Sequence, residues 1–285
     1  MKWSGLRLSV TLLSVIRLRG PVTEPSRADA AAAMAWAPAV GLLLGAVAAA
    51  VLVVADHPLG AGSLTAAGLA VATLALLTRG LHLDGLADLA DGLGSGQPAP
   101  IALDIMRRSD IGPFGTVTLI LALLIQVAGV SHAEAYGPGR GAAALITAVV
   151  TGRLALTWAC RQGVPAARPD GLGALVAGTV PLAIPVALTL AVVTAAVAIS
   201  ATLTGERLGW TLPLAVVAGL AAAFVVQRQS VRRLGGITGD VLGALAEVAT
   251  TVTLVVATMG PRALPPLPPS PPEAVADALG DGLRR

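Results

Sequence analysis

The stretch GLHLDGLADLADGLGSGQPAPIALDIMRRSDIGPFG, residues 80–115, is an acidic segment between long apolar parts of the chain. Asp84, Asp88 and Asp91 follow one another at i, i+4 and i+7, so a helix here would carry all three carboxylates on one face. Like charges at this spacing repel unless a cation lies between them or some are protonated. Mg²⁺ in proteins is commonly held by one or two carboxylates together with substrate phosphates. The segment therefore predicts a magnesium-dependent site, although a merely solvated acidic face is the simpler alternative.

The composition indicates where this site lies. Of the 285 residues, 55% are hydrophobic and only 12% are charged, and the mean hydropathy is +0.81. Soluble domains are about 25% charged, so these values predict an all-α, polytopic membrane bundle. Small residues let membrane helices approach closely, and Gly41 and Gly45 form one such pair. The single Cys160 excludes an intrachain disulfide and a thiolate metal cluster.

Apolar runs of about 17–25 residues are long enough to cross a bilayer as helices. Seven are predicted: Ala33–Ala55, Leu59–Thr78, Pro113–Val130, Gly141–Cys160, Val180–Leu203, Gly209–Gln227 and Val241–Gly260. Pro181 and Pro185 should start or kink the fifth. The N-terminal segment, closed by Arg17 and Arg19, is interpreted as an uncleaved amphipathic or interfacial segment and not as a signal peptide. We expect a catalytic membrane domain at 1–261 and a Pro-rich disordered tail at 262–285.

Most of the 19 Lys and Arg residues fall on one side of these spans, which predicts a cytoplasmic N-terminus. The acidic segment, the loop RQGVPAARPDGLG (161–173) and the segment QRQSVRRLGGITGD (227–240) then share the cytoplasmic side. Carboxylates, arginines and glycine-rich turns could meet there in one cavity. Such a mixture suits a metal-complexed phosphate ester.

Several further residues are candidates for this site. Asp240 and Glu247 lie seven apart on one helix face, and an intramembrane Glu247 suggests a second metal ligand, a proton acceptor or a structural residue. His82 is a candidate general base or a partner that orients the carboxylates. The candidate phosphate-binding arginines are Arg107, Arg108, Arg153, Arg168 and Arg232. The positive-inside rule explains cytoplasmic arginines without any ligand, but Arg153 lies within a span and needs an acidic partner or a phosphate.

Four segments in this order, GLHLDGLADLADGL, DIMRRSDIGPFG, VPAARPDGLG and LGGITGDVLGALAE, resemble the adenosylcobinamide-GDP ribazoletransferase (cobalamin synthase) family. The resemblance covers roughly residues 6–260. It implies a Mg²⁺-dependent, multi-pass enzyme of the cell membrane with its active site facing the cytoplasm. Such an enzyme joins adenosylcobinamide-GDP to α-ribazole or its 5′-phosphate, giving adenosylcobalamin or its 5′-phosphate and GMP.

The resemblance implies that Mg²⁺ bound by Asp84, Asp88 and Asp91 bridges the diphosphate, with a second ion at Asp240 or Glu247. The implied partners are these small molecules and membrane lipid, with no nucleic acid; homo-oligomer formation is left open.

Two other classes of membrane protein can be compared with this pattern. A CDP-alcohol phosphotransferase also uses Asp-rich helices and Mg²⁺, but its motif places Arg where this chain has Asp88. A cation-coupled transporter would carry polar residues along several spans. Most of the predicted spans lack polar groups, and the acidic residues gather at one end.

Overall fold

The computed structural model of the chain describes residues 3–19, 24–137, 139–204 and 210–259. Within these ranges the chain forms helices and no strand, which confirms the all-α fold class. The helices are α1 (Trp3–Leu13), α2 (Arg27–Asp56), α3 (Ser63–Leu77), α4 (Leu81–Gly94), α5 (Ala99–Ile105), α6 (Pro113–Ala135), α7 (Arg140–Ala159), α8 (Gly171–Val176), α9 (Ala183–Thr204), α10 (Thr211–Leu234) and α11 (Gly239–Ala257). The predicted tail at 262–285 lies outside the described residues.

Six helices, α2, α6, α7, α9, α10 and α11, are long and apolar enough to cross a membrane. The predicted span Leu59–Thr78 is matched only in part, by α3 at Ser63–Leu77. Here α3 has only 15 residues, and α4 follows at an angle of 87°. The turn between them uses left-handed backbone at Arg79 (φ 55°) and Gly80 (φ 68°), and Gly80 adopts this conformation without a steric penalty. The count reaches seven if the bent α3–α4 pair is one span.

The other predicted spans are confirmed, with shifted ends. Helix α10 continues to Leu234, past the predicted end at Gln227, because hydropathy marks the apolar part of a helix rather than its last turn. Helix α9 begins at Ala183, so Pro185 occupies its first turn, where a missing backbone N–H costs little. Helix α2 begins earlier than predicted because Ser26 and Asp29 form a capping box, with the Asp29 N–H donating to Ser26 Oγ at 3.2 Å.

Close helix contacts hold the bundle together. A Cβ on Gly41 would lie 3.0 Å from the Val149 carbonyl oxygen, and one on Gly45 would lie 3.1 Å from Ile146 Cα. The predicted small-residue pair therefore lets α2 lie against α7. Large apolar side chains such as Leu121, on α6, and Leu190, on α9, are exposed instead, as expected for a surface that faces lipid.

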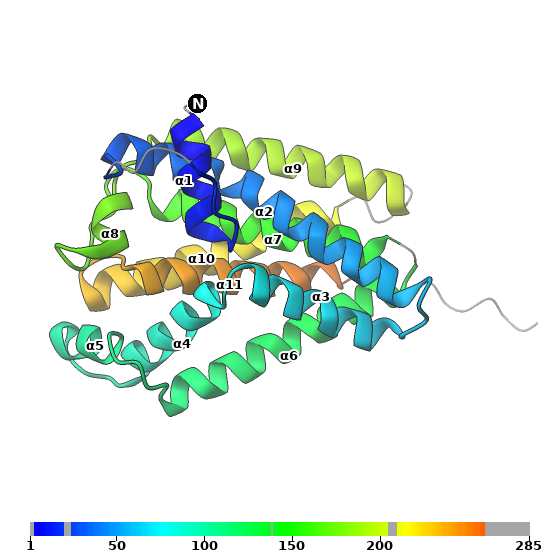
Figure 1. Cartoon of the computed structure of the whole chain (residues 1–285), viewed down its shortest axis with the longest axis horizontal. Coiled ribbons are helices and arrows are strands. Elements are labelled where there is room, and N and C mark those ends of the chain that lie inside the picture. Colours follow the sequence, from blue (N-terminus) through cyan, green and yellow to red (C-terminus); the bar gives the residue numbers. More distant parts are fainter. Residues whose placement is uncertain (1–2, 20–23, 138, 205–209, 260–285) are drawn as a thin grey trace, which may run out of the picture.

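The connections place three polar segments at one end of the bundle (Figure 1). Helices α4, α5 and α8 lie there, beside the junction between α10 and α11. These elements carry the acidic segment, the loop at 161–173 and the segment at 227–240. The prediction that these distant parts of the sequence meet is confirmed.

Candidate active site

A cavity of about 460 Å³, here named the α4–α11 cavity, opens at this end of the bundle. Its volume is within the range of small-molecule sites. Apolar side chains from α1, α2, α4, α7, α8 and α11 line part of it, together with Ile237. The polar and glycine lining consists of His82, Asp84, Arg107, Arg168, Asp170, Gly171, Gly173, Thr238, Gly239, Asp240 and Gly243.

Two glycines bring α4 against α11 and so bring the carboxylates together. A Cβ on Gly85 would lie 2.6 Å from the Asp240 carbonyl oxygen, and one on Gly243 would lie 3.1 Å from the His82 carbonyl oxygen. Asp88, on α4, is consequently close enough to Asp84 and Asp240 for repulsion between their charges. Asp84 and Asp240 line the α4–α11 cavity, and Asp88 borders the neighbouring cavity beside them.

Two loops far apart in the sequence are joined by their backbones. The Ala167 N–H donates to the Ile237 carbonyl, and the Ile237 N–H donates to the Pro165 carbonyl, each at 3.0 Å. Gly236 is required here because a Cβ would lie 2.5 Å from the Pro165 carbonyl oxygen. The pairing places Arg168 where it interacts with Asp88 and Asp240, so it is a cation of the acidic group.

Groups that attract anions lie beside the carboxylates. The Arg107 guanidinium donates to Asp170 Oδ1 at 3.2 Å, and both side chains are more than half exposed. An exposed pair of this kind is worth about 0–1 kcal/mol, so a phosphate could displace Asp170 easily. The positive N-terminal end of α11 also faces the cavity at Thr238 and Gly239.

Asp91 has a different environment from Asp84 and Asp88. It is 7% exposed, and its two carboxylate oxygens accept from the Gly112 N–H at 2.8 Å and the Gly115 N–H at 2.9 Å. It therefore caps α6, whose first turn begins at Pro113. Asp91 borders a separate, shallow cavity together with Asp88 and Arg108.

Glu247 and Arg153 lie deeper, at a cavity of only about 20 Å³. Gln126 donates to Glu247 Oε2 at 2.8 Å, and the charges of Arg153 and Glu247 attract each other. The structure does not bring Glu247 to the α4–α11 cavity, so it separates the predicted pair of Asp240 and Glu247. The acidic partner expected for Arg153 is Glu247.

The remaining predicted residues differ in their position. His82 borders the α4–α11 cavity, is 2% exposed, and neither ring nitrogen has a hydrogen-bond partner. Arg232 is exposed in the last turn of α10 and is not part of the cavity lining. Asp170 and Thr238 were not predicted as site residues. Both belong to the quoted motifs. Their place at the cavity depends on the backbone pairing of the loop at 165–167 with Ile237, which the sequence does not reveal.

The carboxylates around the α4–α11 contact are oxygen donors that fit a hard divalent cation. Among the described residues, Asp84, Asp88 and Asp240 do not form a compact three-ligand group with candidate atoms within 4.8 Å of one another. Mg²⁺ does not require one, since it usually takes one or two carboxylates and completes its shell with water and phosphate oxygens. A cation there would also offset the repulsion around Asp88.

The fold and the cavity together define a multi-span membrane protein with an acidic, arginine-bearing site at one end of its bundle. The chain belongs to the Cobalamin-5-phosphate synthase family, which it matches over residues 5–258. An adenosylcobinamide-GDP ribazoletransferase of Frankia casuarinae is 44% identical over 263 residues, covering 89% of this chain and 94% of the relative. One from Nocardioides sp. is 39% identical over 248 residues, covering 87% and 95%. No solved structure shows significant similarity to the chain.

Proposed function

We propose that this chain is an adenosylcobinamide-GDP ribazoletransferase that uses the α4–α11 cavity as its active site. The observation that carries the proposal is that all four motif segments of the family-matched region meet at one end of the bundle and contribute to the cavity lining. The reaction forms a phosphodiester between a ribose hydroxyl of α-ribazole, or of its 5′-phosphate, and the cobinamide-side phosphorus. The diphosphate P–O bond breaks and GMP leaves.

Mg²⁺ is part of this proposal. Asp84 and Asp88, with Asp240 across the α4–α11 contact, would hold it. When bound, the ion would neutralise charge on the diphosphate oxygens and favour departure of GMP. Asp91 is assigned a supporting role, because both of its oxygens already accept backbone N–H groups of the α6 N-terminus.

The protein's own residues would align the two substrates. Arg107 and Arg168 would bind phosphate oxygens, and the N-terminal end of α11 would add a positive potential. Asp84 and His82 both border the cavity, and either could accept the proton of the attacking hydroxyl. Holding the hydroxyl and the phosphorus in line is the larger part of catalysis in reactions of this type.

The proposal includes a cytoplasmic site at the inner leaflet of the cell membrane. A cavity of about 460 Å³ suits the nucleotide and diphosphate part of the substrate, and the much larger corrin would remain at the surface. The concentration of arginines at this end supports a position on the cytoplasmic side of the cell membrane, under the positive-inside rule. An amphiphilic corrin lying at the inner leaflet would then reach the cavity directly.

The test is GMP release by the purified full-length chain with adenosylcobinamide-GDP, α-ribazole and Mg²⁺. Asp84→Asn and Asp88→Asn should each lower kcat/KM at least about 100-fold, which corresponds to about 2.7 kcal/mol of transition-state stabilisation. Chelation of Mg²⁺ should abolish release.

Asp104→Asn is the matched control, because Asp104 is an exposed carboxylate on α5 outside the cavity lining. It should retain full activity. Undiminished release by both Asp84→Asn and Asp88→Asn would remove these carboxylates from the mechanism, and absence of release by well-folded wild-type protein would refute the assigned activity.

A further inference from the structure

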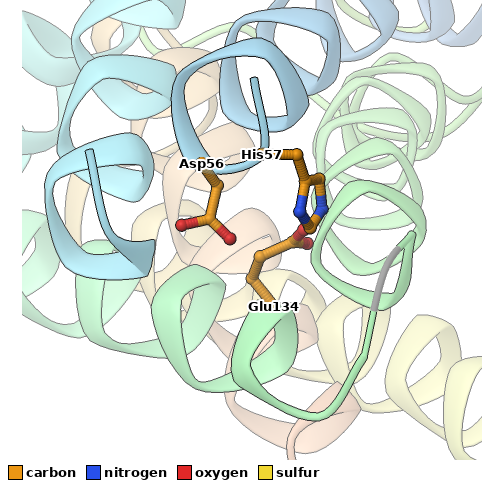
Figure 2. A group of neighbouring side chains, drawn as sticks. All are labelled: Asp56, His57 and Glu134. Carbon is orange, nitrogen blue, oxygen red and sulfur yellow. The ribbon is translucent and has the colours of Figure 1, made fainter. Parts of the chain in front are cut away.

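A second group of ionisable side chains lies at the opposite end of the bundle from the α4–α11 cavity. Asp56 is the last residue of α2, His57 follows it, and Glu134 lies in the last turn of α6. Figure 2 shows the two carboxyl groups and the imidazole ring turned toward one another. One candidate ligand atom from each residue lies within 4.8 Å of the others, and this is the one group of three found in the part of the chain that the structure describes.

The buried carboxylate of Glu134 gives a second indication, separate from the clustering, that this group binds a ligand. It is 4% exposed, and its Oε2 atom has no hydrogen-bond partner, while Oε1 lies 3.0 Å from His57 Nε2. Burying a carboxylate oxygen without a partner is costly, so an ordinary structural role does not account for it. Gly141, in the first turn of α7, has no side chain, and a Cβ there would collide with Oε2. The carboxylate therefore lies against the N-terminal end of α7.

The donor set identifies the kind of ligand. Two carboxylates and one imidazole give two negative charges and three donors, whereas Mg²⁺ and Ca²⁺ sites use oxygen alone. Zn²⁺ accepts this mixture, with Zn–N and Zn–O distances of about 2.0–2.2 Å, which put neighbouring donors about 3.4 Å apart. Shifts of about 1 Å would bring the three side chains onto one ion. Asp56 and His57 are partly exposed and have room to make them.

We propose that Asp56, His57 and Glu134 form a binding site for a divalent transition-metal ion such as Zn²⁺, which ties the end of α2 to the end of α6. The ion takes three protein ligands and leaves a position for water. It is separate from the proposed magnesium site, since it uses an imidazole and lies at the other end of the bundle.

The experiment measures Zn²⁺ bound to the full-length chain, purified in detergent through an affinity tag that contains no histidine. Equilibrium dialysis in saturating Mg²⁺ should show one bound Zn²⁺ for each chain, and Zn²⁺ should raise the thermal unfolding temperature. His57→Gln and Asp56→Asn should each weaken binding more than about 100-fold, because even a group that only orients a ligand is worth about 10–100-fold. Both residues are partly exposed, so the variants should fold.

Two controls locate the ion. His132→Gln changes an exposed histidine of the same α6 end that is not part of the group, and it should bind Zn²⁺ like the wild type. Asp88→Asn should also bind normally. The proposal is overturned if the wild-type chain binds no Zn²⁺, if His57→Gln binds it unchanged, or if Asp88→Asn loses it.

Discussion

The α4–α11 cavity and the interior group around Arg153 and Glu247 contain the same kinds of charged side chain in different surroundings. The cavity measures about 460 Å³ and borders exposed residues such as Asp84 and Arg107. The interior space measures about 20 Å³, enough for about one water, and Arg153 is 2% exposed. A carboxylate beside an arginine in a membrane protein is therefore a candidate site only where substrate can reach it. In the interior, Arg153 and Glu247 attract each other, and Gln126 donates to Glu247.

Helix α11 supplies both environments. Asp240 lies in its first turn, at the cavity, and Glu247 lies seven residues further along the same face. Seven residues advance a helix by about 10 Å, which carries Glu247 away from the open end and into the bundle. One face of α11 thus contributes Asp240 to the candidate site and, about two turns further along, Glu247 to the interior of the bundle.

The largest expected effect separates these two roles. Arg153→Met removes the cation but keeps most of the volume, so Glu247 remains buried without its opposite charge. Breaking a buried pair in this way typically costs about 3–5 kcal/mol. Unfolding of the detergent-solubilised protein should show this loss, and the double variant Arg153→Met with Glu247→Gln should recover much of it. If Arg153→Met is as stable as the wild type but inactive, Arg153 binds substrate. The contrast between an open site and a purely structural interior pair would then be wrong.

A smaller effect tests the contact that assembles the cavity. Gly85→Ala would place a methyl group 2.6 Å from the Asp240 carbonyl oxygen, so α4 and α11 must separate. Overpacking of this kind costs about 1–3 kcal/mol. The rate of GMP release should fall even at temperatures where the variant remains fully folded, because Asp84 and Asp88 move relative to Asp240.

Gly68→Ala is the control for that substitution. It lies in α3, where a Cβ meets nothing within 4 Å, and alanine favours helix. Its activity and unfolding temperature should equal or exceed those of the wild type. Equal losses of activity in both variants would mean that the α4–α11 contact has no special role.

The smallest effect concerns Asp91. Asp91→Asn weakens the cap of α6, for which a loss of about 0.5–2 kcal/mol is usual. The Mg²⁺ concentration that gives half-maximal activity should stay unchanged, in contrast to Asp88→Asn, where it should rise. A raised Mg²⁺ requirement at full stability would show instead that Asp91 is a metal ligand.

The sequence was sufficient for the fold class, for six of the spans and for the meeting of three polar segments, because hydropathy and arginine placement are summed over many residues. It missed that the helix predicted at Leu59–Thr78 begins only at Ser63 and that α4 follows it at 87°, because that bend depends on the left-handed backbone of Arg79 and Gly80. An apolar count cannot detect two dihedral angles. The Gly41 and Gly45 contact was predictable because the spacing itself defines it.

Within the site, the spacing of Asp84, Asp88 and Asp91 correctly predicted a shared helix but not their separate environments. Which carboxylate caps α6 depends on where Gly112 and Gly115 return to α4, a tertiary contact across more than 20 residues of chain. Asp56 and Glu134 were missed for the same reason. They are 78 residues apart, and no local pattern links them.

The backbone pairing of Ala167 with Ile237 has a consequence for how the protein is made. Ile237 lies between the last two helices of the described chain, so Arg168 cannot take its final place until α10 and α11 have entered the bilayer. During synthesis the earlier helices emerge with an unfinished pocket. A chain that stops before α10 would lack Ile237 and Asp240, so its cavity would have neither the partner of the Arg168 loop nor the carboxylate opposite α4.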